Sequence, residues 1–379
     1  MATKTEKETK IKKVSTTKKQ TKSAATKKTV SKKTAVKSAP KKKSVLAGKT
    51  LKSKTPKAKS TKAPAKTNRE TINIFFAATD NYIKYMDVAI TSLIANASKD
   101  YDYRITVLHN GLSKKNEEIL KKHETSNIKI DFKDVEDEIK NLKNILPDAK
   151  NFTMASYYRF LIEKLYPNID KAIYLDCDVV VPGDISDLYK VNLGENLIAA
   201  VNEQMCLLNP FMTQYTIEVE GIDPYKFFNT GVLLLDLKGI REFQLLNRIV
   251  ELMQKYNFES PMVDQSYLNN ILRHRVKLLP NGWNKENVPA SPLEGDLYIR
   301  HYALSTKPWR SKDVEDADLW WKYAQKSDYF DELNEEFSKV TPEDLARDQM
   351  MAGKLFELAA ELLKSDHTFK KLIIDVEDR

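Results

Sequence analysis

Strand-like and helix-like patterns of apolar positions alternate along this chain from residue 72 onward. An apolar run at 72–78 predicts a buried strand, and apolar residues at helical spacing over 86–97 predict a helix after a short polar turn. The same patterns predict strands at 103–109, 128–132, 173–181, 196–201 and 231–237, and helices at 114–123, 157–165 and 243–256. Such alternation is typical of an α/β fold with a mostly parallel sheet.

The C-terminal end of the chain has a helical pattern of its own. From about Thr341, charged residues separate apolar positions at helical spacing, namely Leu345, Met350, Leu355, Leu358 and Leu362. Packing against the rest of the protein and contact with a membrane surface or a partner both fit this pattern. Because no Gly/Pro/Ser-rich linker interrupts the preceding residues, we expect one large domain over 69–330 and a helical extension over 331–379.

Residues 1–68 differ from the rest of the chain in composition. They contain 23 lysines, no arginine and two glutamates, a charge of +21, so the chain's net +9 leaves −12 on residues 69–379. With few large apolar residues, this basic tail cannot bury enough surface to offset its ordering entropy, and we predict that it is disordered. A solvated linker, contact with an anionic membrane and attachment to nucleic acid are its three open roles.

Two further features bear on compartment and redox state. No apolar run approaches the ~20 residues of a transmembrane helix, and the N-terminus lacks the apolar core of a signal peptide. We therefore expect a cytoplasmic protein, either free or peripheral at the inner membrane face. The two cysteines, Cys177 and Cys206, indicate no disulfide framework, and neither belongs to a metal-binding Cys-x-x-Cys. We interpret Cys177 as a small buried residue.

Asp176 and Asp178 stand one residue apart at the end of an apolar run. Carboxylates are costly in apolar surroundings unless they have partners, and a divalent cation with oxygen ligands is one such partner. Pro182-Gly183 follows and ends the strand, which places the acids near the edge where open α/β sheets bind ligands. A metal site and a solvated turn after the strand both fit the pair alone.

Over roughly 71–309 the chain resembles the family-8 retaining glycosyltransferases, which include bacterial lipooligosaccharide galactosyltransferases and glycogenin. Each motif is weak by itself, but the ordered set is specific. The motifs are Ala77-Ala78-Thr79-Asp80-Asn81-Tyr82, Tyr158-Arg159-Phe160, Tyr174-Leu175-Asp176-Cys177-Asp178, Phe228-Asn229-Thr230-Gly231-Val232-Leu233-Leu234, Asp264-Gln265, and His301-Tyr302 with Lys307-Pro308-Trp309.

This resemblance implies a GT-A type fold, a single Rossmann-like nucleotide-sugar-binding domain with a mixed sheet. It implies metal-dependent transfer of a hexose, galactose or glucose, from a UDP-sugar to a glycan, lipopolysaccharide or protein acceptor, with retention at the anomeric carbon. Asp176, Asp178 and His301 would hold Mn²⁺, or Mg²⁺ as the alternative, against the diphosphate. Mixed carboxylate and imidazole ligands suit manganese better than calcium, and the ion would neutralise charge on the departing UDP.

The resemblance also implies contacts to the donor. Lys307 would reach the diphosphate, and Arg159 the sugar or phosphate. Asn229 would lie near the transferred sugar, and Cys177 beside the donor between the two acids. The turn that would bind the uridine consists of Ala78, Thr79, Asn81 and Tyr82, although Tyr82 also fits a core position. One family pattern has an acid at Thr79, so here the base would be recognised by a hydroxyl or by the backbone.

Asp264 and Gln265 are the residues that the resemblance places at the reacting sugar. Asp264 would accept hydrogen bonds from sugar hydroxyls, and Gln265 would lie on the face opposite the leaving group. An amide is a poor nucleophile, which favours front-face attack by the acceptor over a double displacement. Two positions depart from the family: Leu304 replaces a frequent glycine, and Glu203 fits both an acid facing the acceptor and a solvated loop acid.

Two other functions compete with this interpretation. The first is a nucleic-acid-associated protein whose globular part is a non-catalytic scaffold, but the acidic remainder of the chain offers no basic groove. The second is a metal-dependent phosphohydrolase, but the sequence shows no second cluster of acids and histidines for two-metal chemistry. The glycosyltransferase reading is therefore favoured.

Overall fold

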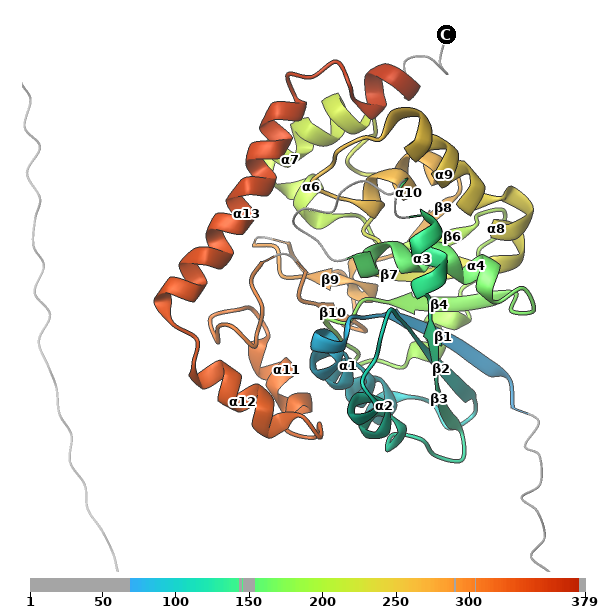
Figure 1. Cartoon of the computed structure of the whole chain (residues 1–379), viewed down its shortest axis with the longest axis vertical. Helices are drawn as coiled ribbons and strands as arrows, with labels where there is room; N and C mark the ends of the chain where they lie inside the picture. The colour runs from blue at the N-terminus through green and yellow to red at the C-terminus, as the bar shows by residue number, and fades with distance from the viewer. Residues whose placement is uncertain (1–68, 143–144, 146–153, 290, 304, 375–379) are drawn as a thin grey trace, which may run out of the picture. The chain divides into compact units, whose positions relative to one another are not determined.

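The computed structural model describes residues 69–142, 145, 154–289, 291–303 and 305–374. These residues belong to one compact unit (Figure 1). The basic tail of residues 1–68, for which disorder is predicted, and the atypical Leu304 lie outside the described residues.

A seven-stranded sheet, in the order β3-β2-β1-β4-β7-β6-β8, forms the centre of the described part of the chain (Figure 1). Strands β1 to β4 run parallel to one another, whereas β7 runs antiparallel to both β4 and β6. The sheet is therefore mixed, as the family resemblance implies. The strands are β1 (Thr71–Ala77), β2 (Asp102–His109), β3 (Ile128–Asp134), β4 (Lys171–Leu175), β6 (Ile198–Ala200), β7 (Val232–Asp236) and β8 (Val276–Leu278).

A second, three-stranded sheet contains β5 (Val179–Val180), β10 (Arg300–His301) and β9 (Lys285–Glu286), in that order. It corrects the prediction of one strand over 173–181, because β4 and β5 belong to different sheets. Apolar residues lie on both sides of the two acids because both strands are buried, so the sequence pattern does not show that the strands belong to different sheets.

Helices cover both faces of the large sheet (Figure 1). On one face lie α1 and α11, and on the other lie α4 and α8 to α10. The α-helices are α1 (Ile83–Asn96), α2 (Lys114–Lys121), α3 (Glu136–Leu142), α4 (Ile162–Leu165), α5 (Ile185–Tyr189), α6 (Gln204–Leu208), α7 (Pro210–Tyr215), α8 (Leu237–Phe243), α9 (Leu245–Tyr256), α10 (Asp264–Leu272), α11 (Ala317–Ala324), α12 (Phe330–Ser338) and α13 (Pro342–Leu362).

Two predicted helices have a different form in the structure. The predicted helix 157–165 is mostly the 3₁₀-helix η2 (Met154–Leu161), with α4 as its last turn. The predicted helix 243–256 is interrupted at Gln244, whose φ of 57° is left-handed and ends α8 before α9 begins. The remaining short helical segments are η1 (Asp80–Tyr82), η3 (Thr216–Glu220), η4 (Asn281–Trp283) and η5 (Lys370–Ile374).

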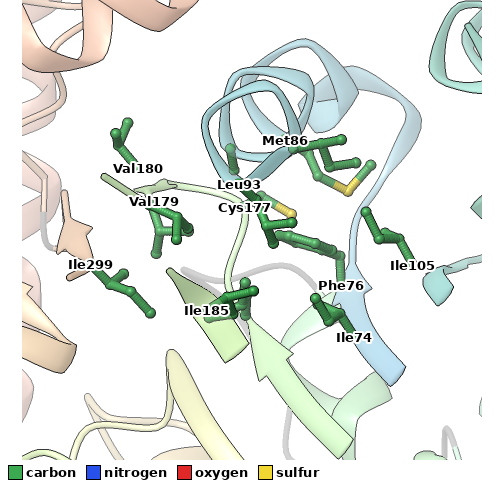
Figure 2. Packing of buried hydrophobic residues seen from close by; sticks show 14 of the residues in the cluster. Ile74, Phe76, Met86, Leu93, Ile105, Cys177, Val179, Val180, Ile185 and Ile299 are labelled. Atoms are coloured by element: carbon green, nitrogen blue, oxygen red, sulfur yellow. The ribbon is translucent and has the colours of Figure 1, made fainter. Parts of the chain in front are cut away.

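Strand β1 separates two apolar cores. Ile74 and Phe76 belong to the core on the α1 side of the sheet, whereas Phe75 belongs to the core on the other side. Alternate residues of a strand face opposite ways, so a strand buried on both faces appears in the sequence as a continuous apolar run. Figure 2 shows Cys177 within the α1-side core, near Phe76 and Leu93.

Helix α13 packs on the domain through its C-terminal part. Ala359 and Leu362 are buried in a third apolar cluster with residues of α6, α7 and η3. Its N-terminus has a capping box, in which Thr341 and Asp344 each bond the backbone of the other. Among the described residues, no helix is long and apolar enough to cross a membrane.

Candidate functional site

Asp176, Asp178 and His301 lie together, each offering a potential ligand atom within 4.8 Å of the others. His301 Nε2 is 3.3 Å from Asp178 Oδ1 and 4.0 Å from Asp176 Oδ2. The structure therefore brings together the three residues that the motif match identified, although His301 lies more than a hundred residues after the two acids in the sequence.

The two acids lie where the chain passes from one sheet to the other. The Asp176 N–H donates to the Gly231 carbonyl, 2.7 Å away, just before β7, and the Tyr302 N–H donates to the Asp178 carbonyl, 2.9 Å away, just after β10. Between them, the Cys177 thiol faces the core and contacts the Ala77 carbonyl at 3.2 Å. Three hydrogen bonds thus hold the turn in place, and its two acidic side chains lie beside His301.

The donor chemistry of this cluster fits a divalent cation. Two carboxylates and one imidazole provide oxygen and nitrogen ligands, the combination that manganese and related ions accept. The Cys177 thiol is not part of this group of ligand atoms, and burial raises its pKa well above the usual value. Its side chain points into the core, which leaves only its backbone for a bound donor.

Lys307 lies at the edge of the cluster. Its Nζ is 2.6 Å from Asp178 Oδ2 and 2.5 Å from the Tyr302 carbonyl oxygen. Burial by itself would raise the pKa of Asp178, but Lys307 and His301 outweigh it and hold that pKa well below its ordinary value. Asp178 is therefore ionised, with a fixed positive charge beside it.

Arg159 is buried between two acids. Its Nη2 is 3.0 Å from Asp176 Oδ1, its Nε is 3.1 Å from Asp264 Oδ2, and Nη1 donates to the Thr230 carbonyl. The guanidinium also lies over the Tyr174 ring, 4.3 Å from its centre. These contacts give Arg159 a role that the sequence does not reveal, since it joins Asp176 of the candidate metal site to the first residue of α10.

Asp264 and Gln265 begin α10 and are both buried. Burial raises the pKa of Asp264 to about 6, with Arg159 acting against this shift and Asp176 adding to it. The Gln265 amide is held at both ends: Oε1 accepts from the Thr230 N–H at 3.1 Å, and Nε2 donates to Glu203 Oε2 at 2.9 Å.

Glu203 is a buried acid rather than a solvated loop acid, with 4% of its surface exposed. Besides Gln265, it accepts from Asn229 Nδ2 at 2.8 Å. Its neighbour Glu286, which no sequence motif singled out, also accepts from Asn229 Nδ2, at 3.0 Å. Burial, followed by the nearby Glu203 charge, raises the pKa of Glu286 well above the usual value.

The predicted uridine turn follows β1. Ala78 is buried, Thr79 is partly buried and Asn81 is exposed. Tyr82 is also partly exposed and lies against Trp309, with 6.1 Å between the ring centres. Burial and the charge of Asp178 raise the pKa of Tyr82.

Comparison with known proteins shows several related enzymes. A lipopolysaccharide 1,3-galactosyltransferase of Salmonella typhimurium is 26% identical over 259 residues, covering 65% of this chain and 75% of that protein. A lipopolysaccharide 1,2-glucosyltransferase of Escherichia coli K12 is 26% identical over 275 residues, covering 67% and 78%. A putative glycosyltransferase of Haemophilus influenzae is 27% identical over 254 residues, covering 64% and 74%.

The fold matches that of solved glycosyltransferases. The galactosyltransferase LgtC, in complex with donor and acceptor sugar analogues, superposes with a TM-score of 0.57 at 24% identity, over 68% of this chain and 96% of that one. The family model described as "Glycosyl transferase family 8" matches residues 73–313. This match spans more than half of the chain, and the protein therefore belongs to glycosyl transferase family 8.

Proposed function

We propose that the protein is a metal-dependent retaining hexosyltransferase that moves galactose or glucose from a UDP-sugar to a glycan, lipopolysaccharide or protein acceptor. Family membership supports the reaction class. The observation that carries the proposal is the cluster of Asp176, Asp178 and His301 beside the ammonium group of Lys307. Two relatives bear the names of a galactosyltransferase and a glucosyltransferase, so both hexoses stay in the proposal.

Asp176, Asp178 and His301 would hold Mn²⁺, or Mg²⁺ as the alternative. Such an ion, when bound, supplies positive charge that stabilises the departing diphosphate. Lys307 would add a second positive charge to the diphosphate, since its ammonium group already lies against Asp178. The turn from Ala78 to Tyr82 would hold the uridine at the adjoining end of β1.

At the transferred sugar, Asp264 would accept hydrogen bonds from hydroxyl groups while Arg159 holds its carboxylate in place. The Gln265 amide is fixed by the Thr230 N–H and by Glu203, and an amide offers no strong nucleophile to the sugar. Both observations support front-face attack, in which the acceptor hydroxyl approaches from the side that UDP leaves. The departing phosphate oxygen would then take the hydroxyl proton.

A phosphohydrolase fits the structure less well. Among the described residues, Asp176, Asp178 and His301 form the single group of three or more His, Cys, Asp or Glu side chains close enough to share a metal ion. Two-metal hydrolysis needs a second group of ligands nearby.

The substitution Asp178→Asn tests the proposal. It removes the ligand charge without changing side-chain volume, and we expect Mn²⁺-dependent turnover of UDP-galactose and UDP-glucose to fall at least about 100-fold, since even indirect neighbours of metal ligands cost 10–100-fold. The measurement is UDP release with and without Mn²⁺. Asp187→Asn, an exposed position on α5, is the matched control and should behave as wild type. Wild-type turnover in Asp178→Asn would refute the metal assignment.

A further inference from the structure

A chain of buried side chains runs from His301 away from the two acids. His301 Nδ1 lies 2.9 Å from Asn284 Oδ1, and Asn284 Nδ2 lies 2.8 Å from Asn229 Oδ1. Asn229 Nδ2 then contacts both Glu203 and Glu286. Asn284 and Glu286 are completely buried, so water does not compete for these hydrogen bonds.

The donor and the acceptor of every hydrogen bond in this chain can be assigned, because the chain contacts groups that can only donate or only accept. The Gly231 N–H, which can only donate, points at Asn229 Oδ1 from 2.8 Å. At the other end of the same amide, the Glu203 carboxylate accepts from Nδ2. The Asn229 amide therefore has one allowed orientation, with its oxygen toward Asn284.

This orientation determines the next two groups. Because Asn229 Oδ1 can only accept, Asn284 must present its NH₂ group to it and its carbonyl oxygen to His301. That oxygen also only accepts, so His301 Nδ1 must carry a proton. In a neutral imidazole the other nitrogen then has the lone pair, and in His301 this is Nε2, which faces Asp176 and Asp178.

We propose that Asn284 is a positioning residue that holds His301 in the Nδ1-protonated tautomer, and that Asn229, Glu203 and Glu286 set the direction of its amide. The inference rests on the proposed role of His301 as a metal ligand. With this tautomer preset, the neutral imidazole offers the lone pair of Nε2 to a cation.

The tautomer is measurable in the metal-free, full-length protein. Long-range ¹H–¹⁵N spectra of ¹⁵N-histidine-labelled protein distinguish protonated from unprotonated ring nitrogens at a pH where the imidazoles are neutral. The chain has five histidines, and the His301 signals are those lost in His301→Gln. We expect a protonated Nδ1 and an unprotonated Nε2. A protonated Nε2 on His301 in the wild-type protein would overturn the proposal without any variant.

Three variants then separate positioning from general damage. Asn284→Leu removes the acceptor, and we expect loss of the tautomer preference and about 10–100-fold weaker binding of Mn²⁺ alone in titration calorimetry. Asn284→Asp keeps an acceptor for Nδ1–H and, with its other oxygen protonated toward Asn229 Oδ1, should retain the tautomer and bind Mn²⁺ as tightly as wild type. The matched control is Asn281→Leu, three residues earlier, which removes a buried amide bonded to the Pro292 carbonyl and the Glu294 N–H.

Unchanged tautomer and Mn²⁺ affinity in Asn284→Leu would overturn the positioning role, as would loss of the tautomer in Asn284→Asp. Failure of the proposed function looks different. If wild-type His301 has the expected tautomer and Mn²⁺ does not bind, the metal assignment is wrong and the amide chain stands. If Mn²⁺ binds and the tautomer is the opposite one, the metal assignment stands and the positioning role is wrong.

Discussion

Gly231 is the residue whose lack of a side chain lets the residues of the proposed metal site meet. A Cβ at this position would lie 2.3 Å from His301 Cε1 and 2.8 Å from Asp176 Oδ2, closer than packed atoms approach. Neither neighbour can retreat easily, since Asn284 holds His301 and Arg159 holds Asp176. Gly231 does not have a positive φ, so its backbone conformation does not require glycine. Glycine is required because a side chain would have no room.

We therefore expect Gly231→Ala to weaken Mn²⁺ binding at least about tenfold, because the added methyl group displaces one ligand from the other. Titration calorimetry with Mn²⁺ measures the effect. Gly353→Ala is the matched control: its Cβ meets open space in the middle of α13, and the change should stabilise the protein by about 1 kcal/mol without altering Mn²⁺ affinity. Equal affinities in wild type and Gly231→Ala would refute the spatial argument.

Helix α10 carries Asp264 and Gln265, and a buried acid ties this helix to its neighbours. Glu220, the last residue of η3, accepts from Tyr215 Oη at 2.8 Å, from Ser266 Oγ at 2.6 Å and from Asn270 Nδ2 at 2.9 Å. Ser266 and Asn270 belong to α10, and Ser266 directly follows the catalytic candidates Asp264 and Gln265. Burial raises the pKa of Glu220 to about 7, which the three hydrogen bonds oppose.

This shift predicts how stability depends on pH. Between the ordinary glutamate pKa of about 4.5 and about 7, the unfolded chain has lost the Glu220 proton while the folded protein keeps it, so stability falls as pH rises. The loss levels off above pH 7 at no more than about 3 kcal/mol. Urea unfolding at pH 5 and pH 8 should show a smaller difference for Glu220→Gln than for wild type.

Glu195→Gln is the control for this comparison, because it removes the same charge from a residue that is exposed. Its pH dependence should match that of wild type. A Glu220→Gln protein that loses as much stability as wild type between the two pH values would contradict the assignment.

At the scale of the whole molecule, the charges divide sharply between the basic tail and the remainder, +21 against −12. The family match begins at residue 73 and the first strand at Thr71, so the lysine-rich segment precedes both. The groups proposed to bind donor and metal all belong to the acidic part.

A protein consisting of residues 69–379 should therefore hydrolyse UDP-sugars with Mn²⁺ as the full chain does, within about twofold, because no proposed contact comes from the tail. Steady-state UDP release and Mn²⁺ titration test this. The full-length protein at matched ionic strength is the control, since a lysine-rich segment attracts anions in a salt-dependent way. Loss of both Mn²⁺ and UDP binding in the shortened protein would show that the domain boundary is wrong.

The sequence by itself determined the α/β class, the position of the acid pair after a buried strand and the ordered motifs, because these depend on local apolar periodicity and on residue types at short spacing. It also identified Asp176, Asp178 and His301 together, since the family motif links them despite their separation.

The tertiary structure alone decided how these residues are held. The break between β4 and β5, the fixed place of Arg159 between two acids, and the amide chain from His301 to Glu286 all depend on contacts between distant segments. An isolated asparagine or glutamate in the sequence carries no signal of such a partner, because its hydrogen bonds exist only once folding has buried it beside residues of another element.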